Sequence, residues 1–305
     1  MSSLLIRDAV NSGRMSFGPF QLRPGEELRP GLIRIVDQIA KKSAALPGFR
    51  SGKADEAIHE ARLLVKLLRA LVWMARPALG RGVGQRIRSH LRAAASCLAD
   101  PRDAAVLAST LSNLAGRVSG DWRRASYALA AEALSRTLTA PGDGLVRRNL
   151  TTSSHHLGQV NLLFRRGAEK TALPWPSATK RGRAAVRSCR KAMKRALSSR
   201  RADDFHQWRK KAKRLLFQLR VAEIAPDPSG RKIIELVDKL QARLGDHHDL
   251  VVLEEHLRKN SILSNRPNSA RNVFKDIHRQ KRAIEKRLIP LGRRCRRVCE
   301  ERLKI

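Results

Sequence analysis

Aromatic and acidic residues are scarce in this sequence. Its 305 residues include one tyrosine, four tryptophans and seven phenylalanines. Because β-strands are rich in such side chains, a sheet-rich fold is disfavoured. The 27 aspartates and glutamates are outnumbered by 63 lysines and arginines, which leaves a formal net charge of +36 and a pI of about 11.6. Such a chain repels itself unless an anion binds it, so we expect nucleic acid, an anionic membrane surface or a phosphate polymer as partner.

The sequence also has few cysteines and no long apolar run. The four cysteines form no CxxC pair, and a chain this rich in apolar helix needs no disulfides, so we expect reduced thiols. Cys295 and Cys299 would share one helical face, which is more typical of a core than of half a zinc site. No apolar stretch approaches the roughly 20 residues of a membrane span, and the first residues lack the apolar core of a signal peptide. We therefore expect a cytoplasmic protein.

Helical periodicity runs through most of the chain. Alanine and leucine dominate the apolar residues, and both favour helix over strand since neither branches at Cβ. Glycine and proline mark the ends of the expected segments. The predicted helices span about residues 32–46, 54–76, 83–98, 102–116, 121–139, 145–172, 177–199, 203–224, 229–244, 247–260 and 268–303. The predicted fold class is all-α.

A pattern of one histidine and two cations occurs twice. His59, Arg62 and Lys66 have the spacing of His206, Arg209 and Lys213, and the two copies lie 147 residues apart. At about 100° per residue, positions i, i+3, i+7 and i+10 of a helix fall within about 80° of one another. We define the first stripe as His59, Arg62, Lys66 and Arg69, and the second stripe as His206, Arg209, Lys210, Lys213 and Arg214.

Apolar residues lie opposite both stripes and are expected to be buried. They are Leu64, Leu67, Leu68, Leu71 and Val72 in the first copy, and Trp208, Ala212, Leu215 and Leu219 in the second. A basic stripe opposite such a face is most often only the solvated side of a helix. Two features favour a binding surface here: neither stripe contains an acidic residue, and the spacing is repeated.

The helix before each stripe carries further candidate ligands. Like charges gathered on one face disfavour the free protein and suit a bound anion. The candidates before the second stripe are Arg183, Arg187, Arg190, Lys191 and Lys194. Those before the first stripe are Arg34, Lys41 and Lys42, which correspond to Arg183, Arg190 and Lys191.

These residue types suit phosphate. Arginine offers a planar fork of donors, lysine a compact charge, and histidine a donor that gains charge beside a phosphate. The histidines need not be catalytic. If they touch the ligand, binding should strengthen as the pH falls towards 6, because a phosphate favours the imidazolium form.

Further matches suggest an internal duplication. The run Asp100–Leu107 corresponds to Asp246–Leu253, and Pro77 corresponds to Pro226, at nearly the same offset as the histidine pattern. The segment 141–144, Pro-Gly-Asp-Gly, is the best candidate for the joint. The halves would span about residues 25–143 and 144–303 after an N-terminal segment 1–24. Each would hold a basic helix, a stripe helix, and an Asp-bearing turn between its third and fourth helices.

With these motifs the chain resembles the CHAD family, the conserved histidine α-helical domain. Members carry a His-x-x-Arg-x-x-x-(Lys/Arg) helix in each of two four-helix halves, and an Arg-Asp or Asn-Asp turn that Arg102-Asp103 and His248-Asp249 match. The resemblance spans roughly residues 25–303. It implies two related helical bundles around a basic channel that binds inorganic polyphosphate, with no catalysis, cofactor or metal. Members are often fused to a β-barrel triphosphate tunnel domain, for which the helical pattern leaves no room, so we expect a stand-alone member.

The chain departs from the family pattern at three positions. Leu216 stands where a basic residue is common, Phe217 where tyrosine is usual, and His248 precedes Asp249. Leu216 weakens one expected phosphate contact, for which Arg214 or Arg220 could compensate. A carboxylate repels phosphate, so we expect Asp103 and Asp249 to act structurally, as N-caps worth about 1 kcal/mol or as orienting partners of a stripe cation.

Two other functions fit parts of the sequence. Electrostatics alone would support non-specific nucleic-acid binding at low salt, although no zinc finger, RNP motif or base-stacking platform is evident. A metal-dependent phosphohydrolase could draw ligands from Asp246-His247-His248-Asp249 or His155-His156. Adjacent helical residues diverge by about 100° and no two histidines occur at i, i+4, so the metal hypothesis is the weaker one. Regulation, scaffolding and attachment to polyphosphate granules are open as cellular roles.

Overall fold

The structure is a computed structural model, and it describes residues 18–23, 25–98, 100–137, 142–169, 173, 175–222 and 228–303. Within these ranges it contains ten α-helices, two short 3-10 helices and no strand. The α-helices are α2 (Leu28–Ala45), α3 (Ala54–Leu79), α4 (Arg81–Ser96), α5 (Asp100–Ala115), α6 (Asp121–Thr137), α7 (Asp143–Glu169), α8 (Trp175–Ser199), α9 (Ala202–Val221), α10 (Pro228–Lys259) and α11 (Pro267–Leu303). The all-α prediction is confirmed. None of the described helices is both long enough and apolar enough to cross a bilayer.

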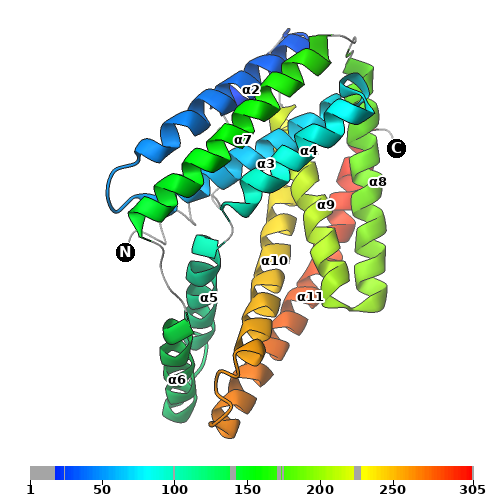
Figure 1. The fold of residues 1–305 in the computed structure, drawn as a ribbon. Coiled ribbons are helices and arrows are strands. Elements are labelled where there is room, and N and C mark those ends of the chain that lie inside the picture. The colour runs from blue at the N-terminus through cyan, green and yellow to red at the C-terminus, as the bar shows by residue number, and fades with distance from the viewer. Residues whose placement is uncertain are drawn as a thin grey trace.

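Four helices form the upper part of the molecule. α7 packs against α2, α3 and α4, and these helices lie together in Figure 1. Their buried side chains form one apolar core, in which α3 contributes residues on almost every turn. The helix α3 is thus surrounded by neighbours, which fixes its rotation about its own axis.

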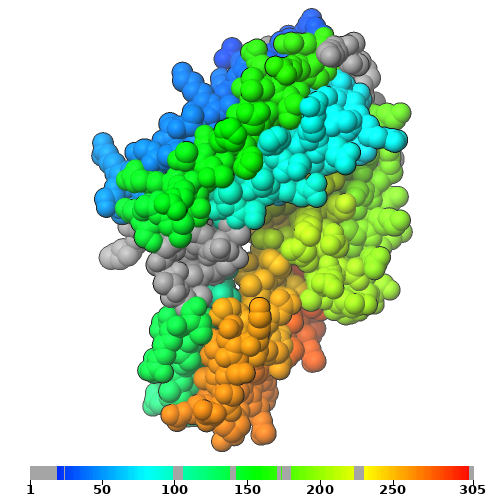
Figure 2. All heavy atoms as spheres, viewed as in Figure 1, coloured from blue at the N-terminus to red at the C-terminus, as the bar shows by residue number. Residues whose placement is uncertain are grey.

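The other six helices share a second apolar core. α8 and α9 pack against each other, α9 also packs against α10, and α10 packs against α11. The hairpin of α5 and α6 lies beside the lower parts of α10 and α11 (Figure 1). On the face shown in Figure 2, α6 and the C-terminal part of α10 form the narrow lower end of the molecule. The two cores do not divide at the expected joint, residues 141–144. The helix α7 follows the joint but lies in the first core, whereas α5 and α6 precede it and lie in the second core.

The two cores meet where α3 contacts α8 and α9. Phe217 and Val221 at the end of α9 are buried in the first core, and the N–H of Leu22 donates to the carbonyl of Val221 at 3.1 Å. In the other direction, Trp73 of α3 packs against the second core. The helices that carry the two stripes are therefore in direct contact.

The expected break after residue 244 is wrong. α10 continues from Pro228 to Lys259, so Asp246, His248 and Asp249 lie inside a helix rather than in a turn. Gly245 is compatible with a helix end, but Leu240 and Leu244 before it and Leu250 and Leu253 after it are all buried in the second core, and this packing on both sides holds the helix intact. Asp249 is consequently not an N-cap. In the segment that the sequence pattern aligns with this one, α4 and α5 are separate helices, and Asp103 lies within the first turn of α5, with a side chain outside the described part.

The cysteine prediction holds. All four thiols are free, and Cys189, Cys295 and Cys299 are buried in the second core. Burial raises the pKa of Cys189 and Cys295 to about 12, so both remain thiols at neutral pH.

Candidate anion-binding site

The first stripe faces away from a fully packed side of α3. Leu64, Leu67, Leu68 and Leu71 have no exposed surface, as the sequence predicts. His59, Arg62 and Lys66 are half-buried, and Arg69 is exposed. The leucines therefore fix the direction in which the four stripe residues point.

Both arginines of the first stripe bond to the backbone around α4. Nη1 of Arg62 donates to the carbonyl oxygen of Leu98, in the turn after α4. Nη2 of Arg69 donates to the carbonyl oxygen of Leu91 at 3.1 Å. Arginine has five N–H donors, so each guanidinium retains donors for a phosphate after making such a bond. Lys66, between the two arginines, is the stripe's compact charge.

The second stripe is anchored in the same way on α9. Trp208 and Ala212 are fully buried and Leu215 nearly so, whereas His206, Arg209 and Lys213 are half-buried and Lys210 and Arg214 exposed. Leu216 is 1% exposed and belongs to the second core, so it does not lie in the stripe as a missing cation. Arg220 forms an ion pair with Asp238 of α10 at 3.0 Å. It therefore ties α9 to α10.

A pair of histidines joins the second stripe to α10. Nδ1 of His206 and Nδ1 of His248 are 3.2 Å apart and the ring centroids 4.4 Å apart. Burial lowers the pKa of His248 to about 3, and the positive charges of Arg209 and Lys213 add to this effect. Burial also lowers the pKa of His206, together with the charges of Lys210 and Arg209. Both imidazoles are therefore neutral in the free protein at pH 7 and share one hydrogen bond.

Arg209 extends from α9 to α10 beside the histidine pair. Its Nε lies 4.0 Å from where a β-carbon on Gly245 would stand. The next residue, Asp246, accepts from Arg243 at 3.4 Å. The stripe arginine thus lies directly beside an acidic segment of α10.

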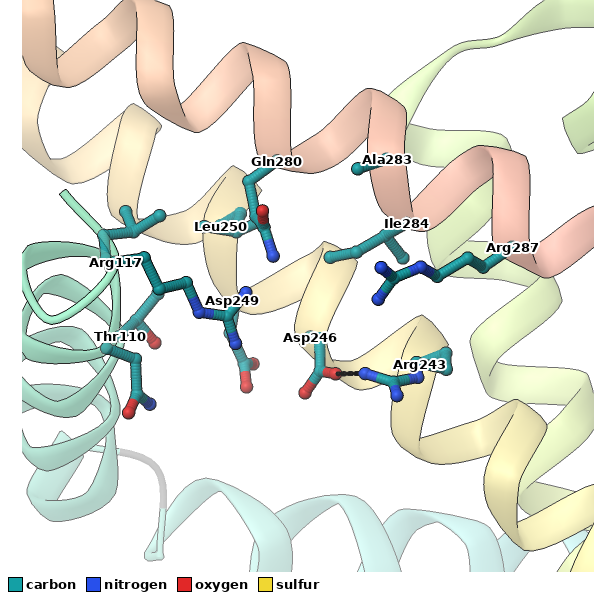
Figure 3. Close-up of a pocket in the computed structure, with 12 residues that line it drawn as sticks. Thr110, Arg117, Arg243, Asp246, Asp249, Leu250, Gln280, Ala283, Ile284 and Arg287 are labelled. Carbon is teal, nitrogen blue, oxygen red and sulfur yellow. Dashed lines mark hydrogen bonds and ion pairs between the residues drawn. The ribbon is translucent and has the colours of Figure 1, made fainter. Parts of the chain in front are cut away.

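A cavity of about 300 Å³ opens next to this segment, between α5, α10 and α11 (Figure 3). Three arginines line it, Arg117, Arg243 and Arg287, together with Asp246 and Asp249. Sequence patterns do not identify these arginines, because they come from three separate segments and belong to no repeated pattern. Their mixture with carboxylates distinguishes the cavity from the acid-free stripes.

Cations from α8 and α9 converge on α3 at Trp73. The guanidinium carbon of Arg181 lies 5.4 Å from the centroid of the Trp73 ring, and that of Arg214 lies 5.8 Å from it. Such contacts with an indole face are worth about 0.5–1 kcal/mol at exposed sites. They bring the end of the second stripe onto the helix of the first.

The candidate cations on the helices before the two stripes differ in the ion pairs that they form within the protein. Arg34 bonds to Glu26 at 2.6 Å and to the carbonyls of Pro19 and Gln21, so it fastens the N-terminal segment to α2. Ion pairs also hold Lys42 to Glu60 and Arg190 to Glu300. The remaining candidates are Arg183, which is half-buried, and Lys41, Arg187, Lys191 and Lys194, which are exposed.

The candidate metal ligands have separate partners. Nε2 of His247 lies 3.1 Å from Glu285, whereas His248 faces His206 and Asp246 faces Arg243. His156 lies 3.1 Å from His90 of α4, measured between Nδ1 atoms. Among the residues that the structure describes, no group of three or more His, Cys, Asp or Glu side chains is arranged to hold a metal ion.

Comparisons with known proteins agree with this architecture. The sequence profile of the CHAD domain matches residues 34–258. Two uncharacterised proteins of Mycobacterium tuberculosis, MT2285 and Rv2226, are each 26% identical over 97% of this chain. The match covers 56% of their length, so the chain spans about half of these relatives. The crystal structure of the CHAD domain from the plant Ricinus communis has the same fold, with a TM-score of 0.64 and 17% identity over 92% of this chain and 94% of that one.

Proposed function

Since the chain belongs to the CHAD domain family, we propose that it binds inorganic polyphosphate without catalysing a reaction. The observation that carries this proposal is the pair of acid-free stripes on two helices that contact each other. Each stripe is oriented by a buried apolar face, so its cations are held in place before a ligand arrives. The protein would act in the cytoplasm, where attachment to polyphosphate granules is one role that such binding could serve.

A thin, flexible chain of phosphates suits the half-buried stripes better than a nucleic acid does. The cations at their centres, Arg62, Lys66, Arg209 and Lys213, are recessed rather than fully exposed. Polyphosphate has no bases or sugars, so every repeat can approach such a surface. The stripes also lack the aromatic side chains on which bases of single strands stack.

We further propose that the chain consists of two related halves around a basic channel. Arg62 reaches Leu98 and Arg209 lies against Gly245, and in both cases the partner follows the arginine by 36 residues. When residues 147 positions apart are aligned, α6 and α7 together correspond to α11. Pro290 within α11 then aligns with residue 143, in the expected joint. This correspondence favours a boundary after α7 rather than at residue 143, because α7 then packs with its own half.

Calorimetric titration with polyphosphates of defined length tests the function. We expect binding above a minimum chain length, because a channel engages several phosphates at once, whereas a flat patch would show a gradual increase with length. Affinity should fall steeply as salt is raised, by counterion release. Short duplex DNA at equal phosphate concentration should not displace long-chain polyphosphate. Displacement by the duplex would contradict the proposal.

Polyphosphate affinity is expected to increase as the pH falls from 8 towards 6. In the free protein, burial and the charges of Lys210 and Arg209 lower the pKa of His206, the member of the pair that belongs to the second stripe. Bound phosphate offsets those cations and raises this pKa, so the complex holds more protons than the free protein and lower pH favours it. Calorimetry at pH 6.5 in two buffers with different ionisation enthalpies measures the proton uptake.

The variant His248→Arg removes this titration, because it places a permanent charge where the first half has Arg102. His155→Gln is the control, since His155 is an exposed histidine on α7. The groups facing the pair are Asp203, Arg209, Lys210 and Lys213 of α9 and His247 of α10, which itself contacts Glu285 of α11. Unchanged proton uptake in His248→Arg would place the ligand away from the pair.

A further inference from the structure

The last helix carries a third acid-free line of cations, which we call the α11 stripe. It consists of Arg271, Lys275, Arg279, Arg282, Lys286, Arg293 and Arg297. At about 100° per residue these seven positions fall within about 80° of one another, and at about 1.5 Å per residue they extend over about 39 Å of helix. The two acidic residues between the ends of the stripe, Asp276 and Glu285, lie off this face and contact other helices.

The α11 stripe is more exposed than the stripes of α3 and α9. All seven side chains are exposed, whereas the central cations of the first and second stripes are half-buried. Among the residues that the structure describes, only Arg279 of the seven has an ion pair, with Asp276 at 3.1 Å, and its side chain remains 65% exposed. Apart from the Arg279–Asp276 pair, the like charges of the α11 stripe therefore repel one another.

The packing of α11 directs this stripe outwards. α11 contacts α6, α8 and α10, and it buries Val273, Ile277, Ile284 and Leu288 against them. It is not among the helices with which α3 makes its principal contacts. The α11 stripe is thus a separate surface on the outside of the second core.

The chemistry of this surface does not suit insertion into a membrane. An interfacial helix buries bulky apolar residues among the lipids beside its basic face. The large apolar residues of α11 are instead used for packing within the protein, and none of the side chains described up to residue 301 is a large exposed apolar one on this helix. A polyanion that remains in water is the better partner.

Among such polyanions, a stiff and wide one fits best. A flexible polyphosphate strand on an exposed helix would contact the protein on one side only. It would lose conformational entropy on binding and gain few contacts in return. Duplex nucleic acid is already ordered, with a persistence length of about 150 base pairs, and carries a phosphate about every 3.4 Å along each strand. Its major groove alone is about 12 Å wide, which suits an exposed helix better than a recess.

We propose that the α11 stripe binds the phosphate backbone of double-stranded nucleic acid without reading its sequence. Arginine and lysine at such an exposed surface contact phosphates, and contacts to phosphates carry no sequence information. Seven contacts would give log K a slope of about −6 against log salt concentration. Because the stripes of α3 and α9 are separate, the protein could hold polyphosphate and a duplex at the same time.

The test compares two variants with the same change in net charge. The stripe variant is Lys275→Glu, Arg282→Glu, Lys286→Glu and Arg293→Glu, and the control variant is Arg50→Glu, Arg86→Glu, Arg148→Glu and Lys259→Glu, whose residues are exposed and scattered. Binding of a fluorescent random-sequence duplex is measured by anisotropy at several salt concentrations. We expect the stripe variant to bind about 100-fold more weakly with a salt slope smaller by about 3.6, and the control to change less than about 5-fold.

Two further arms separate this proposal from the proposed function. The stripe variant should keep its polyphosphate affinity, and a variant of the second stripe, Lys210→Glu with Lys213→Glu, should keep its duplex affinity. If the duplex binding is lost in the second-stripe variant instead, the α11 proposal is wrong. If the stripe variant loses binding to anionic phosphatidylserine vesicles but not to the duplex, the surface serves a membrane and the proposal is also wrong. Failure of polyphosphate binding in every protein tested would contradict only the proposed function.

Discussion

A variant with Lys66, Lys210 and Lys213 replaced by glutamate is expected to bind polyphosphate at least about 100-fold more weakly than the parent at physiological salt. Each substitution removes one attractive contact and adds one repulsive charge beside the phosphates. The three lysines lie on α3 and α9, so the variant alters both stripes. None of the three lysines belongs to either apolar core, and the substitutions leave the apolar faces that orient both helices unchanged.

The choice of lysines follows from what the stripe arginines do in the protein. Arg62 donates to the carbonyl of Leu98, and Arg209 lies across Gly245 on α10. A glutamate at position 62 would direct a carboxylate at a carbonyl oxygen and leave that acceptor without its donor. Loss of binding after such a change could reflect loss of structure, whereas the lysine variant avoids this ambiguity.

Filter-binding or calorimetry with long-chain polyphosphate, beside circular dichroism of the same samples, measures this effect. The matched control replaces Arg50, Arg148 and Lys259 with glutamate, which changes the net charge equally at exposed positions away from both stripes. We expect the control to lose less than about 5-fold in affinity. Equal losses in both variants would mean that overall charge, rather than the stripes, attracts polyphosphate.

Much of the fold could be predicted because the helices are amphipathic and separated by glycine and proline. The leucines of α3 were expected on a buried face and are fully buried there. The predicted break at Gly245 is wrong, although the glycine and the polar run after it resemble a helix end, because leucines on both sides of it are buried in the second core and α10 continues between them. Local signals of a helix end therefore lose to tertiary packing at that position.

The composition of the candidate site was less predictable than the positions of the stripes. Helical periodicity is enough to place His206, Arg209 and Lys213 on one face. It cannot show that His206 meets His248, or that Arg117, Arg243 and Arg287 surround one cavity, because these contacts join helices that are distant in sequence. Leu216 illustrates the same limit, since its correspondence to Arg69 suggested the stripe face but its side chain is in the core.

Asp276 is a buried charge that joins α11 to the α5–α6 hairpin. Its side chain is 3% exposed and accepts from Arg123 of α6 at 2.5 Å and from the hydroxyl of Tyr127 at 3.3 Å, with Arg279 at 3.1 Å on its own helix. Burial and the carboxylate of Asp276 raise the pKa of Tyr127, so its hydroxyl stays protonated and remains a donor. The contact joins residues that are 153 positions apart in the chain.

Asp276→Ala is expected to destabilise the protein by about 3–5 kcal/mol, because it leaves the Arg123 guanidinium and the buried Tyr127 hydroxyl without their acceptor. Asp276→Asn should cost less, since the amide oxygen still accepts one hydrogen bond. Glu132→Ala removes the exposed Glu132–Arg136 ion pair from the same hairpin and should stay within about 0.5 kcal/mol of the parent. Urea unfolding measures all three, and limited proteolysis should cut the α5–α6 hairpin first in Asp276→Ala. If that variant loses no more stability than Glu132→Ala, packing of α5 and α6 alone holds the hairpin in place.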